Sequence, residues 1–172
     1  MPAPPDELSR EEFTEFYRRS APALWSFVRR TCGDSEQADD ILQEAFLRFL
    51  RGRPAGMDDR QKRAYLFRIS DRLVIDGWRR AGLDKKHLAD NPEAGGGRAE
   101  TLAPDMKRTF ALLKPRDRTL LWLAHVEGYS HEEIASIMGL REESIKVLLF
   151  RSRSALAKLL KERGYGGEAD HE

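Results

Sequence analysis

The hydrophobic and polar positions in the first half of the chain follow the helical period, with apolar residues three and four positions apart. No run in this half alternates with the period of two that is typical of a β-strand. Ser9 and Glu12 form a capping box, which predicts that a helix begins there. Pro22 lacks the N–H group that a helix interior needs, so we expect a break, with helices near residues 9–20 and 22–32.

Two further helices are predicted in this half. Asp34 can cap the first of them. Its apolar positions form one stripe, which consists of Ala38, Ile41, Leu42, Ala45, Phe46, Phe49 and Leu50. Gly52, Pro54 and Gly56 then interrupt the pattern. The next helix is expected from about residue 60, and arginines occupy the side opposite its apolar residues: Arg68, Arg72 and Arg79.

A linker is expected at residues 83–103, because this segment contains three consecutive glycines, a proline and few large apolar side chains. The helical pattern resumes with Met106 and Phe110, and Pro115 suits the first turn of a helix that we expect to reach Gly128. The sequence therefore predicts an all-α protein with two small helical domains joined by a flexible linker. The expected ranges are 9–82 for the first domain, 83–103 for the linker, 104–163 for the second domain and 164–172 for a tail.

The stretch from residue 129 to residue 153 has the pattern of a helix-turn-helix. Ser130 and Glu133 form a second capping box, Ala135 is small where two helices would cross, and Gly139 can take the left-handed conformation of the turn. Ile145 then returns to the core. An ordinary helical hairpin is the alternative, which the shared register of these features disfavours.

Composition indicates a globular protein, because charged residues make up 34% of the 172 residues and the hydrophobic set 40%. The formal net charge of +1 hides an asymmetry along the chain. Residues 1–44 hold five basic and ten acidic residues, residues 45–86 hold twelve and five, and residues 87–172 hold thirteen and fourteen. The basic middle block suits the phosphates of nucleic acid, and a solvated helix face is the alternative that charge alone leaves open.

The sequence gives no pattern typical of an enzyme, a metal site or a membrane span. His131 and Glu132 lack the second histidine of a metalloprotease motif, and residues 95–97 with Arg98 lack the lysine and hydroxyl of a phosphate loop. The single cysteine, Cys32, cannot form an intramolecular disulfide and suits a reducing compartment. No stretch approaches about 20 apolar residues, and the acidic start is unlike a secretory signal. We therefore expect a cytoplasmic, non-enzymatic protein without a metal or cofactor.

Three segments resemble the extracytoplasmic-function (ECF) sigma factors of bacterial RNA polymerase, a subfamily of the sigma-70 family. They are ADDILQEAFLRFL at residues 38–50, YLFRISDRLVIDGWRR at residues 65–80 and the helix-turn-helix, in the order and separation of the family. The resemblance implies a first domain that binds the polymerase clamp and melts the minus-ten promoter element. It implies a second domain that binds the minus-thirty-five element and the polymerase flap.

The resemblance places the contact with core polymerase on the second predicted helix. The residues that it implies there are Asp39, Asp40, Ile41, Gln43 and Glu44. Exposed acidic groups on this helix can pair with basic groups of the clamp. The alternative is an acidic first turn that complements the helix dipole, worth ~0.3–1 kcal/mol per charge.

Opening a duplex requires cations that follow phosphates and aromatic side chains that hold unpaired bases. The resemblance implies minus-ten residues on the third helix, namely Lys62, Arg63, Tyr65, Arg68, Arg72, Trp78, Arg79 and Arg80. Many family members have tryptophan in place of Tyr65 and asparagine in place of Arg72, two departures that bear on base preference. Residues 69–80 look more like the iron-uptake subgroup. The alternative for Tyr65 and Trp78 is a place in the domain core.

The second helix of the helix-turn-helix is expected to enter the major groove with the side chains that point away from the core. These are Arg141, Glu142, Glu143, Lys146, Val147, Phe150, Arg151 and Arg153. The family pattern is retained at Lys146, Arg151 and Arg153, which we expect on phosphates. Val147 and Leu148 replace a serine and an arginine of that pattern, and Leu148 is expected to face the core.

The partners that the resemblance implies are core RNA polymerase, promoter DNA and an anti-sigma protein that masks the same surfaces. No small-molecule substrate and no membrane insertion are expected. A different class stays open at this point, either a stand-alone helix-turn-helix regulator or a sigma mimic that sequesters a partner. A regulator would normally dimerise to read two half-sites, whereas a sigma factor is expected to be monomeric and to bind DNA weakly without polymerase.

Overall fold

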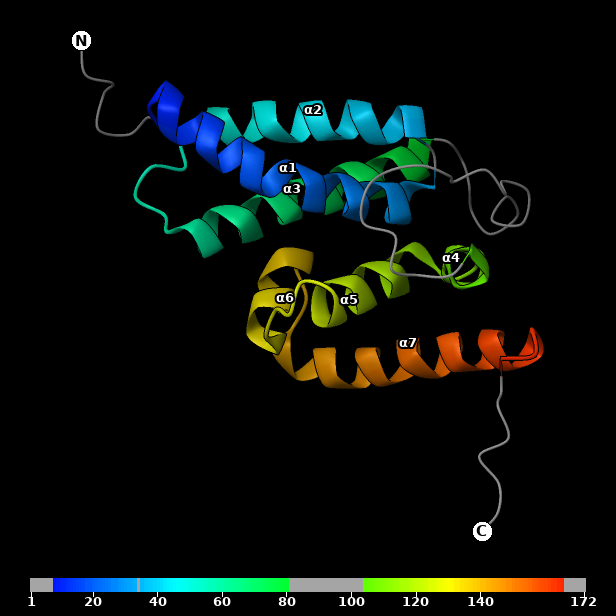
Figure 1. Ribbon diagram of the computed structural model, residues 1–172. Helices are drawn as coiled ribbons and strands as arrows, with labels where there is room; N and C mark the ends of the chain where they lie inside the picture. The colour runs from blue at the N-terminus through cyan, green and yellow to red at the C-terminus, as the bar shows by residue number, and fades with distance from the viewer. Residues whose placement is uncertain (1–7, 34, 81–103, 166–172) are drawn as a thin grey trace.

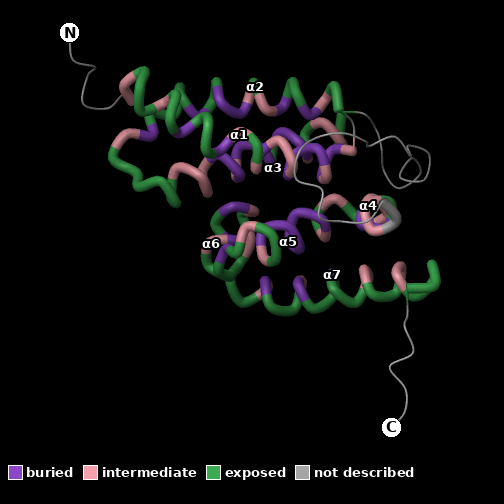
Figure 2. Tube along the Cα trace, in the orientation of Figure 1, coloured by how far each residue is buried: buried purple, intermediate pink, exposed green. Residues whose placement is uncertain are grey.

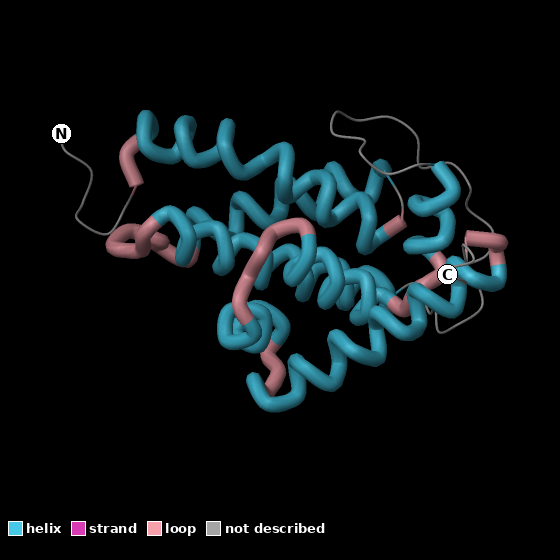
Figure 3. The backbone as a smooth tube through the Cα atoms, turned by 60° about the horizontal axis from the view of Figure 1, so that its bottom comes forward, coloured by secondary structure: helices cyan, strands magenta, loops and turns pink. Residues whose placement is uncertain are grey.

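The computed structural model describes residues 8–33, 35–80 and 104–165. Within these residues the chain forms seven α-helices and no strand (Figure 1; Figure 3). The helices form two groups, α1 to α3 and α4 to α7, which confirms the prediction of an all-α protein with two helical domains. The expected linker and most of the expected tail lie outside the described residues, as does Asp34.

The first domain consists of α1 (Arg10–Cys32), α2 (Ser35–Arg51) and α3 (Asp59–Arg80), each packed against the other two. The predicted capping box begins α1: Ser9 Oγ accepts a 3.2 Å hydrogen bond from the Glu12 N–H, and the Glu12 carboxylate accepts one of 2.8 Å from the Ser9 N–H. All three helices contribute buried side chains to the core, including Phe16, Leu24, Phe27, Ala38, Phe49, Leu66 and Phe67.

The break predicted at Pro22 is wrong, because α1 continues through this residue. Pro22 is exposed, and the buried Phe16 and Leu24 on either side of it pack into the same core. Proline removes a hydrogen bond from a helix interior. Packing on both sides outweighs this loss, so two short helices become one long one.

The second domain consists of α4 (Pro104–Ala111), α5 (Pro115–His125), α6 (His131–Met138) and α7 (Glu142–Glu162). α5 ends before the expected Gly128, because the chain turns at that glycine with a φ of 69°. α7 packs along α4, α5 and α6, and α5 also packs against α6. The long C-terminal helix therefore holds the three shorter ones together.

The predicted helix-turn-helix is formed by α6 and α7. Ser130 Oγ accepts a 3.2 Å hydrogen bond from the Glu133 N–H at the start of α6, and Gly139 ends that helix with a φ of 65°. This φ is the left-handed conformation that favours glycine. Ala135 and Ile145 are buried where the two helices meet. The local sequence signals thus predict this motif correctly.

The two domains contact each other along α3 and α1. α3 packs against α6, and α1 packs against α4 and α5. As a result α5 lies between the first domain and α7 (Figure 1). Much of α5 is buried, whereas α2 and α7 keep exposed faces on opposite sides of the molecule (Figure 2). Nothing in the periodicity of the sequence predicts this contact.

Candidate functional site

The outer side of α2 carries the acidic residues that the sequence predicts. Asp39, Asp40 and Gln43 are exposed, and Asp39 accepts a 2.9 Å hydrogen bond from Trp25 Nε1. Glu44 accepts a 2.6 Å hydrogen bond from Arg48 Nε, and this bond lowers the pKa of the Glu44 carboxyl. The lowered pKa favours the ionised form of the Glu44 carboxyl at neutral pH.

The apolar residues of α2 are placed differently from the prediction, because one predicted contact residue is buried and two leucines are exposed. Ile41, one of the predicted contact residues, is buried in the core of the first domain. Leu50, expected in the buried stripe, is 39% exposed, and Leu47 is 48% exposed. Leu47 lies four residues after Gln43, so helical spacing alone could have placed it on the same face. We call Asp39, Asp40, Gln43, Glu44 and Leu47 the α2 face.

The residues predicted on α3 do not form one continuous surface. Three are exposed in the second half of the helix: Arg72, Arg79 and Arg80. Four are half-buried and lie beside the second domain: Arg63, Tyr65, Arg68 and Trp78. The remaining one, Lys62, is half-buried with its Nζ 4.0 Å from Asp59. We call these eight residues the α3 set.

The second domain contacts or faces the half-buried members of the α3 set. Arg63 Nη2 donates a 2.9 Å hydrogen bond to Glu127, which lies between α5 and α6. Tyr65 and Arg68 line a groove whose opposite wall belongs to α6. The Tyr65 ring also packs against Phe49, with 6.0 Å between the centroids. Tyr65 is thus partly packed in the core of the first domain, which agrees with the alternative given for it in the sequence.

Arg118 joins the two domains from a fully buried position on α5, with 1% of its surface exposed. Its Nη1 donates 3.2 Å hydrogen bonds to the carbonyl oxygens of Arg30 and Thr31, in the last turn of α1. Carbonyls at a helix end lack intrahelical partners and carry partial negative charge, which a guanidinium complements. The guanidinium lies 5.3 Å from the centroid of the Trp78 ring. Burial lowers the pKa of Arg118 to about 10, so the group stays charged at neutral pH.

A second contact joins Arg60 near the start of α3 to Glu133 in the first turn of α6. The Arg60 guanidinium donates two hydrogen bonds to the Glu133 carboxylate, and the bond from Nη2 is 2.7 Å long. The guanidinium also lies 5.1 Å from the centroid of the Tyr129 ring. These bonds are the main reason that the pKa of Glu133 falls to about 2. Arg60 and Glu133 lie in different predicted domains, as do Arg118 and the carbonyl groups that it binds. No local sequence pattern could therefore have predicted either contact.

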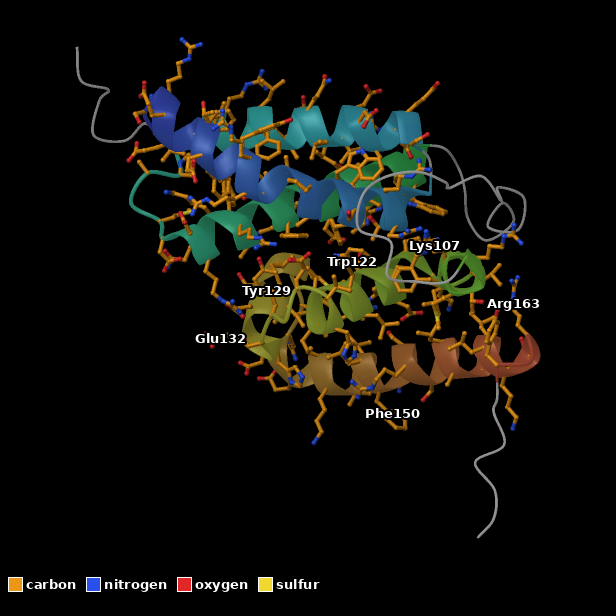
Figure 4. The ribbon with its side chains drawn as sticks, in the orientation of Figure 1. Lys107, Trp122, Tyr129, Glu132, Phe150 and Arg163 are labelled. Carbon is orange, nitrogen blue, oxygen red and sulfur yellow. The ribbon has the colours of Figure 1, made fainter. Side chains whose placement is uncertain are left out.

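The predicted residues of α7 lie on its exposed side, as expected. They are Arg141, Glu142, Glu143, Lys146, Val147, Phe150, Arg151 and Arg153. Phe150 is 66% exposed and points away from the other helices (Figure 4). Leu148 is half-buried against the core, as expected. Arg116 of α5 lines a shallow groove beside Arg141 and Arg151, a neighbour that only the fold reveals.

The described residues hold no cluster of three or more histidine, cysteine, aspartate or glutamate side chains that could bind a metal ion. In the same described ranges, no helix combines the length and hydropathy needed to cross a bilayer. The exposed surfaces instead carry groups suited to binding: carboxylates on α2, cations on α3, and cations beside the exposed Phe150 on α7.

Two family models match the chain, one in each domain. The model described as Sigma-70 region 2 matches residues 16–83, and the one described as Sigma-70, region 4 matches residues 105–156. An RNA polymerase sigma-E factor of Streptomyces avermitilis is 30% identical over 162 residues, which cover 92% of this chain and 90% of that protein. The ECF RNA polymerase sigma factor SigL of Mycobacterium tuberculosis is 28% identical over 159 residues, which cover 86% and 88%.

Solved structures share the arrangement of helices. The sigma factor RpoE of Bartonella quintana, solved with the anti-sigma factor NepR, has a TM-score of 0.70 at 22% identity, with 88% of this chain and 98% of that chain covered. CnrH, solved with the cytosolic domain of CnrY, has a TM-score of 0.66 at 23% identity, with 90% of each chain covered. At these identities the likeness concerns the fold alone.

Proposed function

Because the chain belongs to the extracytoplasmic-function sigma factors of the sigma-70 family, we infer that it binds core RNA polymerase and directs transcription to specific promoters. The observation that carries this conclusion is the presence of both sigma-70 regions, in order, each on its own helical domain. Sigma factors are non-enzymatic initiation factors, so no catalytic residue is assigned. The protein would act where the polymerase and the chromosome are, in the bacterial cytoplasm.

The α2 face is our proposed contact with core polymerase. Its exposed carboxylates suit a basic partner surface, and Leu47 supplies apolar area beside them. Ile41 is left out of this contact because its side chain is buried in the first domain. Charge steers the encounter of two such surfaces, and the apolar part adds stability once water is excluded.

The first domain, at residues 9–82, is proposed to open and hold the minus-ten element with the α3 set. Arginines suit the phosphates of a single strand, while Tyr65 and Trp78 can stack with unpaired bases. The three exposed arginines of the set support this role directly. The half-buried members could take part only if the second domain moved away from them.

The second domain, at residues 104–163, is proposed to bind the minus-thirty-five element in the major groove through α7. Lys146, Arg151 and Arg153 are assigned to phosphates, which fix the position of the helix without reading sequence. Arg116 extends this cationic edge from α5. The exposed Val147 and Phe150 are assigned to base edges, where apolar side chains can contact thymine methyl groups.

An anti-sigma protein is a further proposed partner. The solved relatives RpoE and CnrH were captured with NepR and CnrY respectively, which supports a partner of this class.

We also propose membership of the iron-uptake-like subgroup, on the resemblance of residues 69–80 and the basic Arg72. Transcript profiling with and without iron, in a strain that overproduces the chain, tests the subgroup.

Reconstituted transcription tests the function as a whole. Purified chain and core polymerase are incubated with a library of promoter fragments, and transcript starts are mapped. We expect initiation at a restricted set of sequences that depends on the chain, with core enzyme alone as the control. If starts are no more specific than those of core enzyme alone, the proposed function is wrong.

A further inference from the structure

A tryptophan of α1 is bonded to the α2 face from the neighbouring helix. Trp25 Nε1 donates a 2.9 Å hydrogen bond to Oδ1 of Asp39, and the two residues lie on α1 and α2 respectively. Glu44 is bonded by Arg48 of its own helix, whereas Asp39 is bonded by a side chain of another helix. The pattern that predicts Asp39 as a contact residue gives no role to Trp25.

Trp25 is itself held in place by its surroundings. Its side chain is half-buried where α1 and α2 pack against each other. The guanidinium of Arg29, one helical turn further along α1, lies 5.7 Å from the centroid of the Trp25 ring. Arg29 is only 7% exposed, and a cation at this distance is attracted to the aromatic ring. The indole N–H group is therefore a donor whose position is restricted.

The hydrogen bond from Trp25 leaves Asp39 able to bind a partner. An indole supplies one N–H donor, whereas an ionised carboxylate can accept several hydrogen bonds through its two oxygens. Asp39 is exposed, so a second donor can reach its carboxylate from outside. Because indole is neutral, the bond can orient the carboxylate without cancelling its charge.

We propose that Trp25 is a positioning residue for the polymerase contact, and that it holds the Asp39 carboxylate in the orientation that a basic group of the polymerase meets. The inference rests on the proposed role of the α2 face. A side chain that is free in solution loses rotational freedom when it binds, and this loss opposes association. Asp39 has already lost part of that freedom to the bond with Trp25, so less of it remains to be lost on binding.

Nuclear magnetic resonance tests the bond itself in the full chain. The chain contains three tryptophans, so a 1H–15N correlation spectrum should contain three indole N–H resonances. Trp25→Phe identifies the resonance of Trp25 by its disappearance. Asp39→Ala should then move this resonance further than the other two, because it removes the acceptor of the bond. An unmoved Trp25 resonance would show that the bond is absent, which would overturn the proposal.

Surface plasmon resonance with immobilised core polymerase tests the positioning. Trp25→Phe keeps an aromatic ring and removes the N–H donor, and we expect it to weaken binding about fivefold. Tyr17→Phe is the matched control, because Tyr17 is an aromatic residue of the same helix whose ring packs on Phe46 rather than on Asp39. This control should bind as the wild-type chain does, and all variants should keep the wild-type helix content by circular dichroism.

A double-mutant cycle separates positioning from a merely structural effect. In the Asp39→Ala background, Trp25→Phe should cause no further loss of affinity, because no carboxylate remains to be oriented. The proposal is refuted if Trp25→Phe weakens binding equally in both backgrounds, or if Trp25→Phe alone binds with wild-type affinity. Neither result concerns transcription by the wild-type chain, so the reconstituted assay decides separately whether the proposed function stands.

Discussion

Thr119 of the second domain donates a 3.1 Å hydrogen bond from Oγ1 to the carboxylate of Asp71 on α3. Both side chains are buried at the contact between the domains. Burial raises the pKa of Asp71 to about 6, and the bond from Thr119 and the charge of Arg72 offset only part of this effect. Above that pH the contact contains a buried carboxylate that opposes its stability.

Asp71→Asn is expected to stabilise the chain at pH 8, by on the order of 2 kcal/mol in the free energy of unfolding. A carboxyl whose pKa rises on folding favours the folded state when it is protonated. This contribution is fully present below the unfolded pKa of about 3.9 and is lost as the pH rises through about 6. Urea titrations between pH 5 and pH 8 should therefore show a gap between variant and wild type that widens with pH.

Asp76→Asn is the matched control, because Asp76 lies on the same helix with its side chain exposed. Its gap from wild type at pH 8 should be smaller than that of Asp71→Asn. A pH-independent gap for Asp71→Asn would contradict the ionisation that we assign to the buried carboxyl.

Charge reversal on the α2 face should weaken the binding of core polymerase. The double substitution Asp40→Lys with Glu44→Lys replaces two carboxylates by cations on the surface that we assign to a basic partner. We expect roughly a hundredfold loss of affinity, since like charges at an interface cost several kcal/mol. Surface plasmon resonance with immobilised core enzyme measures it.

Glu11→Lys serves as the control for this experiment, because Glu11 is exposed in the first turn of α1 and is not part of the α2 face. Helix content by circular dichroism should be the same in all three proteins. Wild-type affinity in the Asp40 and Glu44 variant would remove the α2 face from the polymerase contact.

Neutralising α7 should change the salt dependence of promoter binding by the complete holoenzyme. With Lys146→Ala and Arg151→Ala, the slope of log K against log salt should fall by about one unit per lost phosphate contact. Lys158→Ala, further along the exposed part of α7, should leave the slope as in wild type. An equal slope in all variants would place Lys146 and Arg151 outside the DNA interface.

The parts of the fold that the sequence predicts are those whose causes are local. Ser9 with Glu12, and Ser130 with Glu133, form capping boxes within four residues of chain, and Gly139 needs only its own φ to end α6. The helical period likewise places most residues of the α2 face and all predicted residues of α7 on exposed sides.

The parts that the sequence misses depend on residues far apart in the chain. Nothing in the sequence around Arg118 distinguishes it from the other arginines. Its role becomes visible only in the fold, where it binds the carbonyl oxygens of Arg30 and Thr31. The partition of the α3 set into open and covered members has the same origin. Pro22 is the local exception, because tertiary packing overrides the conformational preference on which the predicted break rested.

Gly52 permits the close approach of Tyr65 to the end of α2. A methyl group at position 52 would collide with the hydroxyl group of Tyr65. The Tyr65 ring is held in this place by packing against Phe49. Gly52→Ala is therefore expected to displace Tyr65 and to cost about 1–3 kcal/mol of stability, as overpacking commonly does. Tyr65→Phe removes the hydroxyl that takes the closest contact, so most of this cost should disappear when both substitutions are present. A double-mutant cycle from urea titrations measures the coupling, and an equal cost of Gly52→Ala in both backgrounds would show that Tyr65 does not occupy this position.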